Sequence, residues 1–208
     1  MLAMQHQRFS EEDILTVVQK IISVFIRHRT IANEGTNVLE TGFAAIAQKI
    51  WSLELRTSQD VIDQLDQNLL KSDRETESNF SQLQKESKQG AKKWTLVYLL
   101  SELYCGVYDD FNNDDLYQKV FDEDRYQPMH IMEDRQITEV DYLGNWTIIE
   151  KEIHLEEAVS QNDVVIKLKR SQLIANEMLA AKIERSGWSD LEINERQKKL
   201  GREVYIIW

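Results

Sequence analysis

Cysteine, proline and glycine are all scarce in this sequence, and each shortage excludes something. Cys105 is the single cysteine, so the chain cannot form an internal disulfide or a zinc site built on thiolates. One proline and seven glycines among 208 residues leave few tight turns, which favours a mostly helical fold. No stretch reaches the ~18 apolar residues of a membrane span, and no basic region precedes a long apolar run near residue 1. We therefore expect a cytoplasmic protein without a membrane partner.

Positive charge is also in short supply. The net charge is −11, and residues 102–157 carry most of it, with sixteen acidic against four basic residues. Affinity for nucleic acids comes largely from Lys and Arg side chains that neutralise phosphates, so this segment is poorly suited to grip a phosphate backbone. We interpret the acids of residues 109–124 as a solvated surface. Mimicry of DNA, or shielding of a site, is the alternative.

Apolar residues that recur at helical spacing predict most of the secondary structure. Residues 10–29 begin with Ser10 as a helix cap, and an apolar stripe then runs from Ile14 to Phe25. The same spacing predicts further helices over residues 38–53, 58–72, 94–108, about 158–185, and 189–208. Ser58 and Ser189 are the expected caps of two of them. The polar residues 73–93 predict an exposed segment, anchored only by Phe80 and Leu83.

One segment has the pattern of strands. Residues 136–153, QITEVDYLGNWTIIEKEI, alternate in polarity around Gly144-Asn145, which predicts a short hairpin with its turn at these two residues. The expected fold class is therefore mostly α, or α+β. We expect a helical subdomain at residues 1–108, and a second part at residues 109–208 that combines the β element with the last two helices.

Two of the four histidines bracket the Gly144-Asn145 pair. His130 stands in the apolar run Met-His-Ile-Met, and His154 follows the second half of the expected hairpin. Taken alone, a histidine between apolar residues indicates a hydrogen-bonded structural side chain. A His–Asn–His site is the functional alternative. The Arg-His-Arg cluster at residues 27–29 is likewise either the charged end of a helix or a phosphate clamp.

Several patterns occur in the order found in one known family. They are YQPMHIMED at 126–134, YLGNWTIIEKEIH at 142–154, and a last helix that contains Trp188, Ile193, Arg196 and Leu200 and ends at Trp208. Together with the helical residues 21–50, they resemble the C-terminal HNH-like region of the GmrSD-type modification-dependent restriction endonucleases. The resemblance covers nearly the whole chain. The nucleotide-binding half of that family, which senses modified bases, has no counterpart among these residues.

The resemblance implies a small ββα unit of HNH type that holds one Mg²⁺ or Mn²⁺ ion. In such a site the metal polarises the scissile phosphate, and a histidine takes the proton of the attacking water. His130 would be that base. Asn145 would hold the loop or orient His130, and His154 would be a metal ligand, with Asn162 as the alternative ligand.

The resemblance also implies a DNA-binding surface and shows one departure. Lys167, Lys169 and Arg170 form the best basic patch for DNA, the alternative being a solvated helix face. Met129 stands where the family has an acidic metal ligand, and a thioether is a poor ligand for Mg²⁺. A carboxylate of the Glu133-Asp134 pair could replace that ligand.

Three functions are compatible with these patterns. The first is an HNH-like DNA endonuclease subunit that acts with a DNA-modification-sensing protein partner in restriction or phage defence. The alternative is a catalytically inactive homologue that serves as an interaction or regulatory module. An acidic immunity or antitoxin-like helical protein is a third reading, which the charge alone favours.

Some expectations concern geometry. Arg196 shares a helix face with Trp188 and Leu200, so it should be partly buried and paired with an acid or a backbone carbonyl. The imidazoles of His130 and His154 should approach within about 8 Å, and Met129 should point to the opposite face of its strand from His130. Four tryptophans should be at least partly buried: Trp51, Trp94, Trp188 and Trp208.

Overall fold

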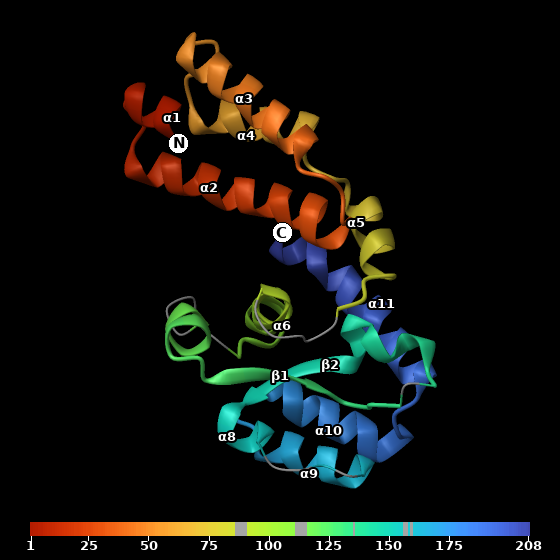
Figure 1. The fold of residues 1–208 in the computed structure, drawn as a ribbon. Coiled ribbons are helices and arrows are strands. Elements are labelled where there is room, and N and C mark those ends of the chain that lie inside the picture. Colours follow the sequence, from red (N-terminus) through yellow and green to blue (C-terminus); the bar gives the residue numbers. More distant parts are fainter. Residues whose placement is uncertain (86–90, 111–115, 135, 156–157, 159) are drawn as a thin grey trace. The chain divides into compact units, whose positions relative to one another are not determined.

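The computed structural model describes residues 1–85, 91–110, 116–134, 136–155, 158 and 160–208. The chain divides into two compact units, the first formed by residues 1–79 with Trp208 and the second by residues 80–207. Helices predominate, and the described strands form a single two-stranded antiparallel sheet (Figure 1). The expectation of a mostly helical fold with a small β element is confirmed. The subdomain boundary expected after residue 108 falls inside the second unit.

The described secondary-structure elements of the first unit are all helical. Its elements are α1 (Leu2–His6), α2 (Glu11–Phe25), the π-helical turn η1 (Ile26–Ile31), α3 (Asn37–Trp51), α4 (Ser58–Asn68) and α5 (Asp73–Phe80), the last of which runs into the second unit. Val17, Leu39 and Leu65 are almost fully buried where α2, α3 and α4 meet. Not all of the apolar stripe expected on α2 packs in this core, since Ile22 and Phe25 are exposed.

Two helix starts in the first unit follow from local hydrogen bonds. The Ser10 hydroxyl accepts from the backbone N–H of Asp13, as expected. The cap of α4 is Thr57, and the expected cap Ser58 is instead its first helical residue. Thr57 accepts from the N–H of Asp60, and the Asp60 carboxylate accepts from the N–H of Thr57. This reciprocal pair satisfies two N–H groups, which Ser58 alone would not do.

The Arg-His-Arg cluster lies in η1, and its first two side chains are buried. Arg27 donates to the Trp208 carbonyl at 2.8 Å and to the Lys71 carbonyl at 2.8 Å, and it pairs with Asp73 at 2.6 Å. His28 lies 3.2 Å from a carboxylate oxygen of Glu34. Because these contacts occupy both side chains inside the unit, neither Arg27 nor His28 is available to clamp a phosphate.

One expectation for this part of the chain is wrong. Trp51 is 55% exposed, because it ends α3, where the ring of His6 in α1 stacks on it at 4.1 Å between centroids. The segment expected to be exposed at 73–93 begins with the mostly exposed helix α5, and Phe80 and Leu83 are its buried anchors, as expected. Residues 86–90 of that segment lie outside the described residues. The other three tryptophans are partly or fully buried, as expected.

The second unit contains the sheet between helices. Its elements are α6 (Ala91–Tyr108), η2 (Leu116–Asp122), β1 (Tyr126–His130), η3 (Thr138–Asp141), η4 (Leu143–Asn145), β2 (Trp146–Glu150), α8 (Lys151–His154), α9 (Gln161–Arg170), α10 (Ile174–Ser186) and α11 (Asp190–Ile207). Among the described helices of both units, none combines the length and apolar character that crossing a lipid bilayer requires.

The observed strand pairing differs from the expected hairpin. β1 pairs with β2 so that His130 faces Trp146 and Tyr126 faces Glu150. Residues expected to form the first arm are instead the 3-10 turn Thr138–Asp141, and Gly144-Asn145 belong to η4 instead of a hairpin turn. The hairpin prediction was therefore right for its second strand only.

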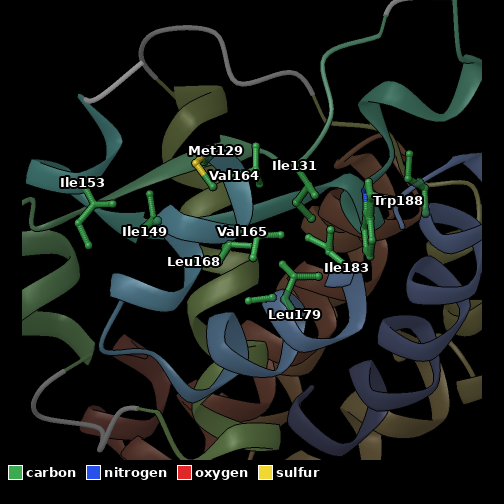
Figure 2. Close-up of a cluster of buried hydrophobic side chains, with 12 residues drawn as sticks. Met129, Ile131, Ile149, Ile153, Val164, Val165, Leu168, Leu179, Ile183 and Trp188 are labelled. Carbon is green, nitrogen blue, oxygen red and sulfur yellow. The ribbon is translucent and has the colours of Figure 1, made fainter. Parts of the chain in front are cut away.

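One hydrophobic cluster of the second unit lies between the sheet and the helix pair α9–α10 (Figure 2). Met129 and Ile149 project from the strands toward Val165, Leu168 and other apolar residues of the helices. The single helix expected at about 158–185 is two helices, because Ser171 is extended, with φ −65° and ψ 145°, and ends α9. The two helices then pack side by side, which one continuous helix could not do.

α11 approaches η4 so closely that a glycine is required there. A Cβ atom on Gly144 would lie 2.4 Å from the Ile193 carbonyl oxygen and 2.8 Å from the Gln197 nitrogen. The Gly144 N–H donates to the Gln197 side chain at 2.6 Å, and Gln197 in turn donates to the carbonyls of Phe80 and Leu83. The Gly-Asn signal thus reflects close packing of a helix, not a hairpin turn.

Candidate functional site

His130 is the last residue of β1. Its ring lies against Trp146, its partner across the sheet, with 3.4 Å between ring centroids. Its Nε2 atom is 3.7 Å from a carboxylate oxygen of Asp141, and the side chain is 19% exposed. Met129 packs in the core on the other face of the strand, as the alternation of side chains predicts. Asp141 was not foreseen as a neighbour of His130, because the sequence placed it in a strand.

Asn145 is fully buried and is a structural residue of the loop that joins the strands. Its Oδ1 atom accepts from the Met132 N–H at 3.1 Å and from the Trp188 indole at 3.0 Å. Its Nδ2 atom donates to the carbonyls of Met132 at 2.7 Å and Val140 at 2.9 Å. A carboxamide has two donors and two lone pairs, so these four bonds fill its capacity. Asn145 therefore holds the loop, and the expected orientation of His130 does not come from it.

His154 is the last residue of α8 and lies against β1. Burial holds the pKa of its imidazole below the ordinary 6.5, and the charge of Lys167 lowers the pKa further. A hydrogen bond to the Pro128 carbonyl and the charge of Glu133 act in the opposite direction. The imidazole is therefore neutral at neutral pH, the form in which histidine binds metals.

The three cations expected to bind DNA do not share one surface. Lys167 is 5% exposed, and its ammonium donates to the His154 carbonyl at 3.2 Å. Lys169 and Arg170 are exposed on α9, and Lys169 pairs with Glu184 of α10 at 2.6 Å. Lys167 thus faces the protein interior, and only Lys169 and Arg170 of the expected patch reach the surface.

The residues implied as metal ligands are not assembled into a complete site. Among the described residues, no group of three or more His, Cys, Asp or Glu side chains is arranged to hold a metal ion. Asn162, the alternative ligand, is exposed near the start of α9, and Glu133 and Asp134 are exposed after β1. His130 contacts Trp146 and Asp141, whereas His154 contacts Pro128 and Lys167. The approach of the two imidazoles to within about 8 Å stays a prediction.

Arg196 forms a buried network that the sequence predicted in part. Its guanidinium donates to the carbonyls of Gly144 at 2.8 Å and Trp146 at 2.6 Å, and to the Tyr104 hydroxyl at 3.0 Å. The expected pairing with backbone carbonyls is confirmed. The Tyr104 hydroxyl also bonds Thr147 at 2.7 Å, a contact that no local pattern in the sequence signals.

Comparisons of the chain with protein-family models, with curated proteins and with solved structures found no match.

Proposed function

We propose that residues 126–154 form a ββα unit of HNH type that does not work as a metal centre. The chain would then serve as an interaction or regulatory module beside a DNA-modification-sensing partner in restriction or phage defence. Two antiparallel strands lead directly into a helix that ends at His154, with His130 at the end of the first strand. This order of elements supports the HNH-like part of the proposal.

The contact between Lys167 and His154 carries the non-catalytic part. In the implied site His154 would bind a divalent cation. The buried ammonium of Lys167 donates a hydrogen bond to the backbone carbonyl of His154, and its charge lowers the pKa of the His154 imidazole. The same positive charge opposes a bound Mg²⁺ or Mn²⁺ ion. Lys167 thus stabilises the fold where a nuclease would concentrate negative charge.

Met129 and Asn145 add to this argument. Met129 occupies the position of the missing acidic ligand, but its side chain is buried in the hydrophobic core. All four hydrogen bonds of the Asn145 side chain go to the loop backbone and to the Trp188 indole. Both side chains are used for stability, which leaves His130 and His154 as the remaining elements of the implied site.

Nicking of supercoiled plasmid tests this function. We expect no cleavage above background by the wild-type chain in Mg²⁺ or Mn²⁺. We also expect the heat of mixing with Mn²⁺ to be the same for the wild type and for His154→Ala. Metal-dependent nicking that disappears in both His130→Ala and His154→Ala would overturn the proposal.

A second candidate is an active endonuclease subunit, and one observation favours it. Asp141 lies 3.7 Å from the Nε2 atom of His130, and a small side-chain movement would bring the two within hydrogen-bond distance, the arrangement in which a carboxylate orients a general base. If this function is correct, Asp141→Asn should reduce nicking while leaving the fold intact. The same plasmid assay therefore separates the two candidates.

A further inference from the structure

The first unit contains a hollow between α3 and α4, remote in sequence from the candidate site. Its volume is about 560 Å³, within the range typical of small-molecule sites. The residues of α3 that face it recur every three or four positions from Asn37 to Lys49, a span of about 18 Å along the helix. The hollow is therefore an elongated groove that follows one face of α3.

Part of the groove lining is apolar, formed by Val38, Ala45 and Ile46 of α3 and by Leu69 at the end of α4. The other lining side chains are polar: Asn37, Thr41, Lys49, Gln64 and Asn68. Leu69 fits against the backbone of α3 because residue 42 is a glycine, and a Cβ there would lie 2.9 Å from its Cδ1 atom. The groove thus offers an apolar chain a row of apolar contacts beside polar side chains.

One positive charge lines the groove. The ammonium of Lys49 is half-buried and donates to the side-chain oxygen of Gln64 at 2.6 Å. Gln64 is a neutral amide, and within the described residues no carboxylate forms an ion pair with Lys49. An ammonium donates up to three hydrogen bonds, so it retains donors for a ligand. A partly desolvated cation at the end of an apolar surface attracts an anion more strongly than one in open solvent.

We propose that this groove binds a small amphiphilic ligand with an apolar chain and one carboxylate. The chain would lie over Ala45, Ile46 and Leu69, and the carboxylate would meet the Lys49 ammonium. Burial of the chain contributes affinity through the apolar surface removed from water, and the ion pair selects the head group. The proposal is independent of whether the second unit cleaves DNA.

Binding of octanoate to the full chain tests the proposal, with octylamine and octanol as ligands of the same chain length. We expect octanoate to shift the amide resonances of α3 and α4, and to bind about tenfold or more tightly than octylamine. In Lys49→Met the affinity for octanoate should fall by about tenfold, whereas the affinity for octanol should not change. Equal affinities of wild-type protein for octanoate and octylamine would overturn the proposed head-group site.

A pair of adjacent substitutions tests the location. Ala44 and Ala45 are both exposed on α3, but only Ala45 lines the groove. Ala45→Glu should abolish octanoate binding, because it places bulk and negative charge in the groove, and Ala44→Glu should leave binding unchanged. Both variants should melt like the wild type. Octanoate binding that survives Ala45→Glu, or that both variants lose equally, would show that the groove is not the site.

Discussion

Asn145 shows how a residue expected to assist catalysis can be fully used for structure. The family resemblance implied that it would hold the loop or orient His130, and its side chain bonds the backbone of the loop. The sequence could not show that Trp188, forty-three residues later, supplies one of its four hydrogen bonds. Contacts over such separations depend on tertiary packing, which no local pattern encodes.

Substitution of Asn145 should therefore destabilise the second unit strongly. Asn145→Ala leaves two N–H groups and two carbonyls without their partner, and each unsatisfied buried group costs about 1–3 kcal/mol. We expect a loss of at least about 3 kcal/mol in the free energy of unfolding, measured by urea denaturation. The matched control is Asn162→Ala, at an exposed position on α9. Similar effects of the two substitutions would contradict this account.

His154 should titrate below the ordinary histidine pKa of 6.5, because it is partly buried and lies near the charge of Lys167. The unfolded chain then takes up a proton more readily than the folded one. The contribution of His154 to stability is thus complete above pH 6.5 and is lost as the pH falls through this value toward the folded pKa.

An NMR titration of the His154 ring proton measures this pKa directly. Lys167→Met should raise the pKa, because it removes the neighbouring positive charge. In His154→Gln, stability should decline less between pH 7 and 5 than in the wild type. A folded-state pKa at or above 6.5 would contradict the lowering by burial and by the charge of Lys167.

At the scale of the elements, the sequence predicts where helices form, but not which elements pack or pair with one another. The periodicity of residues 10–25 and the cap at Ser10 predict α2 correctly, because both depend on neighbours within one or two turns. The sequence of α9 and α10 has no proline or glycine to mark their separation, so one helix was expected. The polarity pattern around Gly144-Asn145 did not indicate β1 as the partner of β2, because fifteen residues separate the two strands, and only the family resemblance placed His130 on a first strand.

Gly144 gives the sharpest test at this scale. A Cβ at this position would collide with the backbone of α11, at 2.4 Å from the Ile193 oxygen. Forced overpacking typically costs about 1–3 kcal/mol, so Gly144→Ala should lower the free energy of unfolding by about 3 kcal/mol. Gly35→Ala is the control, since a Cβ there meets nothing within 4 Å. Thermal unfolding followed by circular dichroism will compare them, and equal melting temperatures would refute the close approach of α11.

For the molecule as a whole, composition predicted the helical class, but the division of the chain did not follow from sequence. The expected boundary lay where the most apolar helix gives way to an acidic stretch, after residue 108. The observed boundary lies at residue 79, because α6 belongs to the second unit, where Leu96, Leu100 and Leu103 are completely buried. A change from apolar to acidic residues shows where the chain becomes exposed to solvent. The limits of a compact unit depend instead on which elements pack together.

Trp208 belongs to the first unit although residues 80–207 form the second. Its side chain is 6% exposed, and its carbonyl accepts from the buried Arg27. Trp208→Ala should destabilise the first unit by about 3–5 kcal/mol, the usual range for a buried tryptophan. Hydrogen exchange should then accelerate in α2 and α3 more than in α9 and α10. Unchanged exchange in α2 and α3 would contradict the assignment of Trp208 to this unit.

The position of Trp208 also sets an order of events during synthesis. A ribosome completes residues 1–79 long before Trp208 emerges. Arg27 of η1 therefore cannot bond the Trp208 carbonyl until the second unit has been synthesised. Until then the guanidinium of Arg27 lacks an acceptor that it has in the finished protein. The first unit can begin to fold early but reaches its final stability only after the second unit has been synthesised.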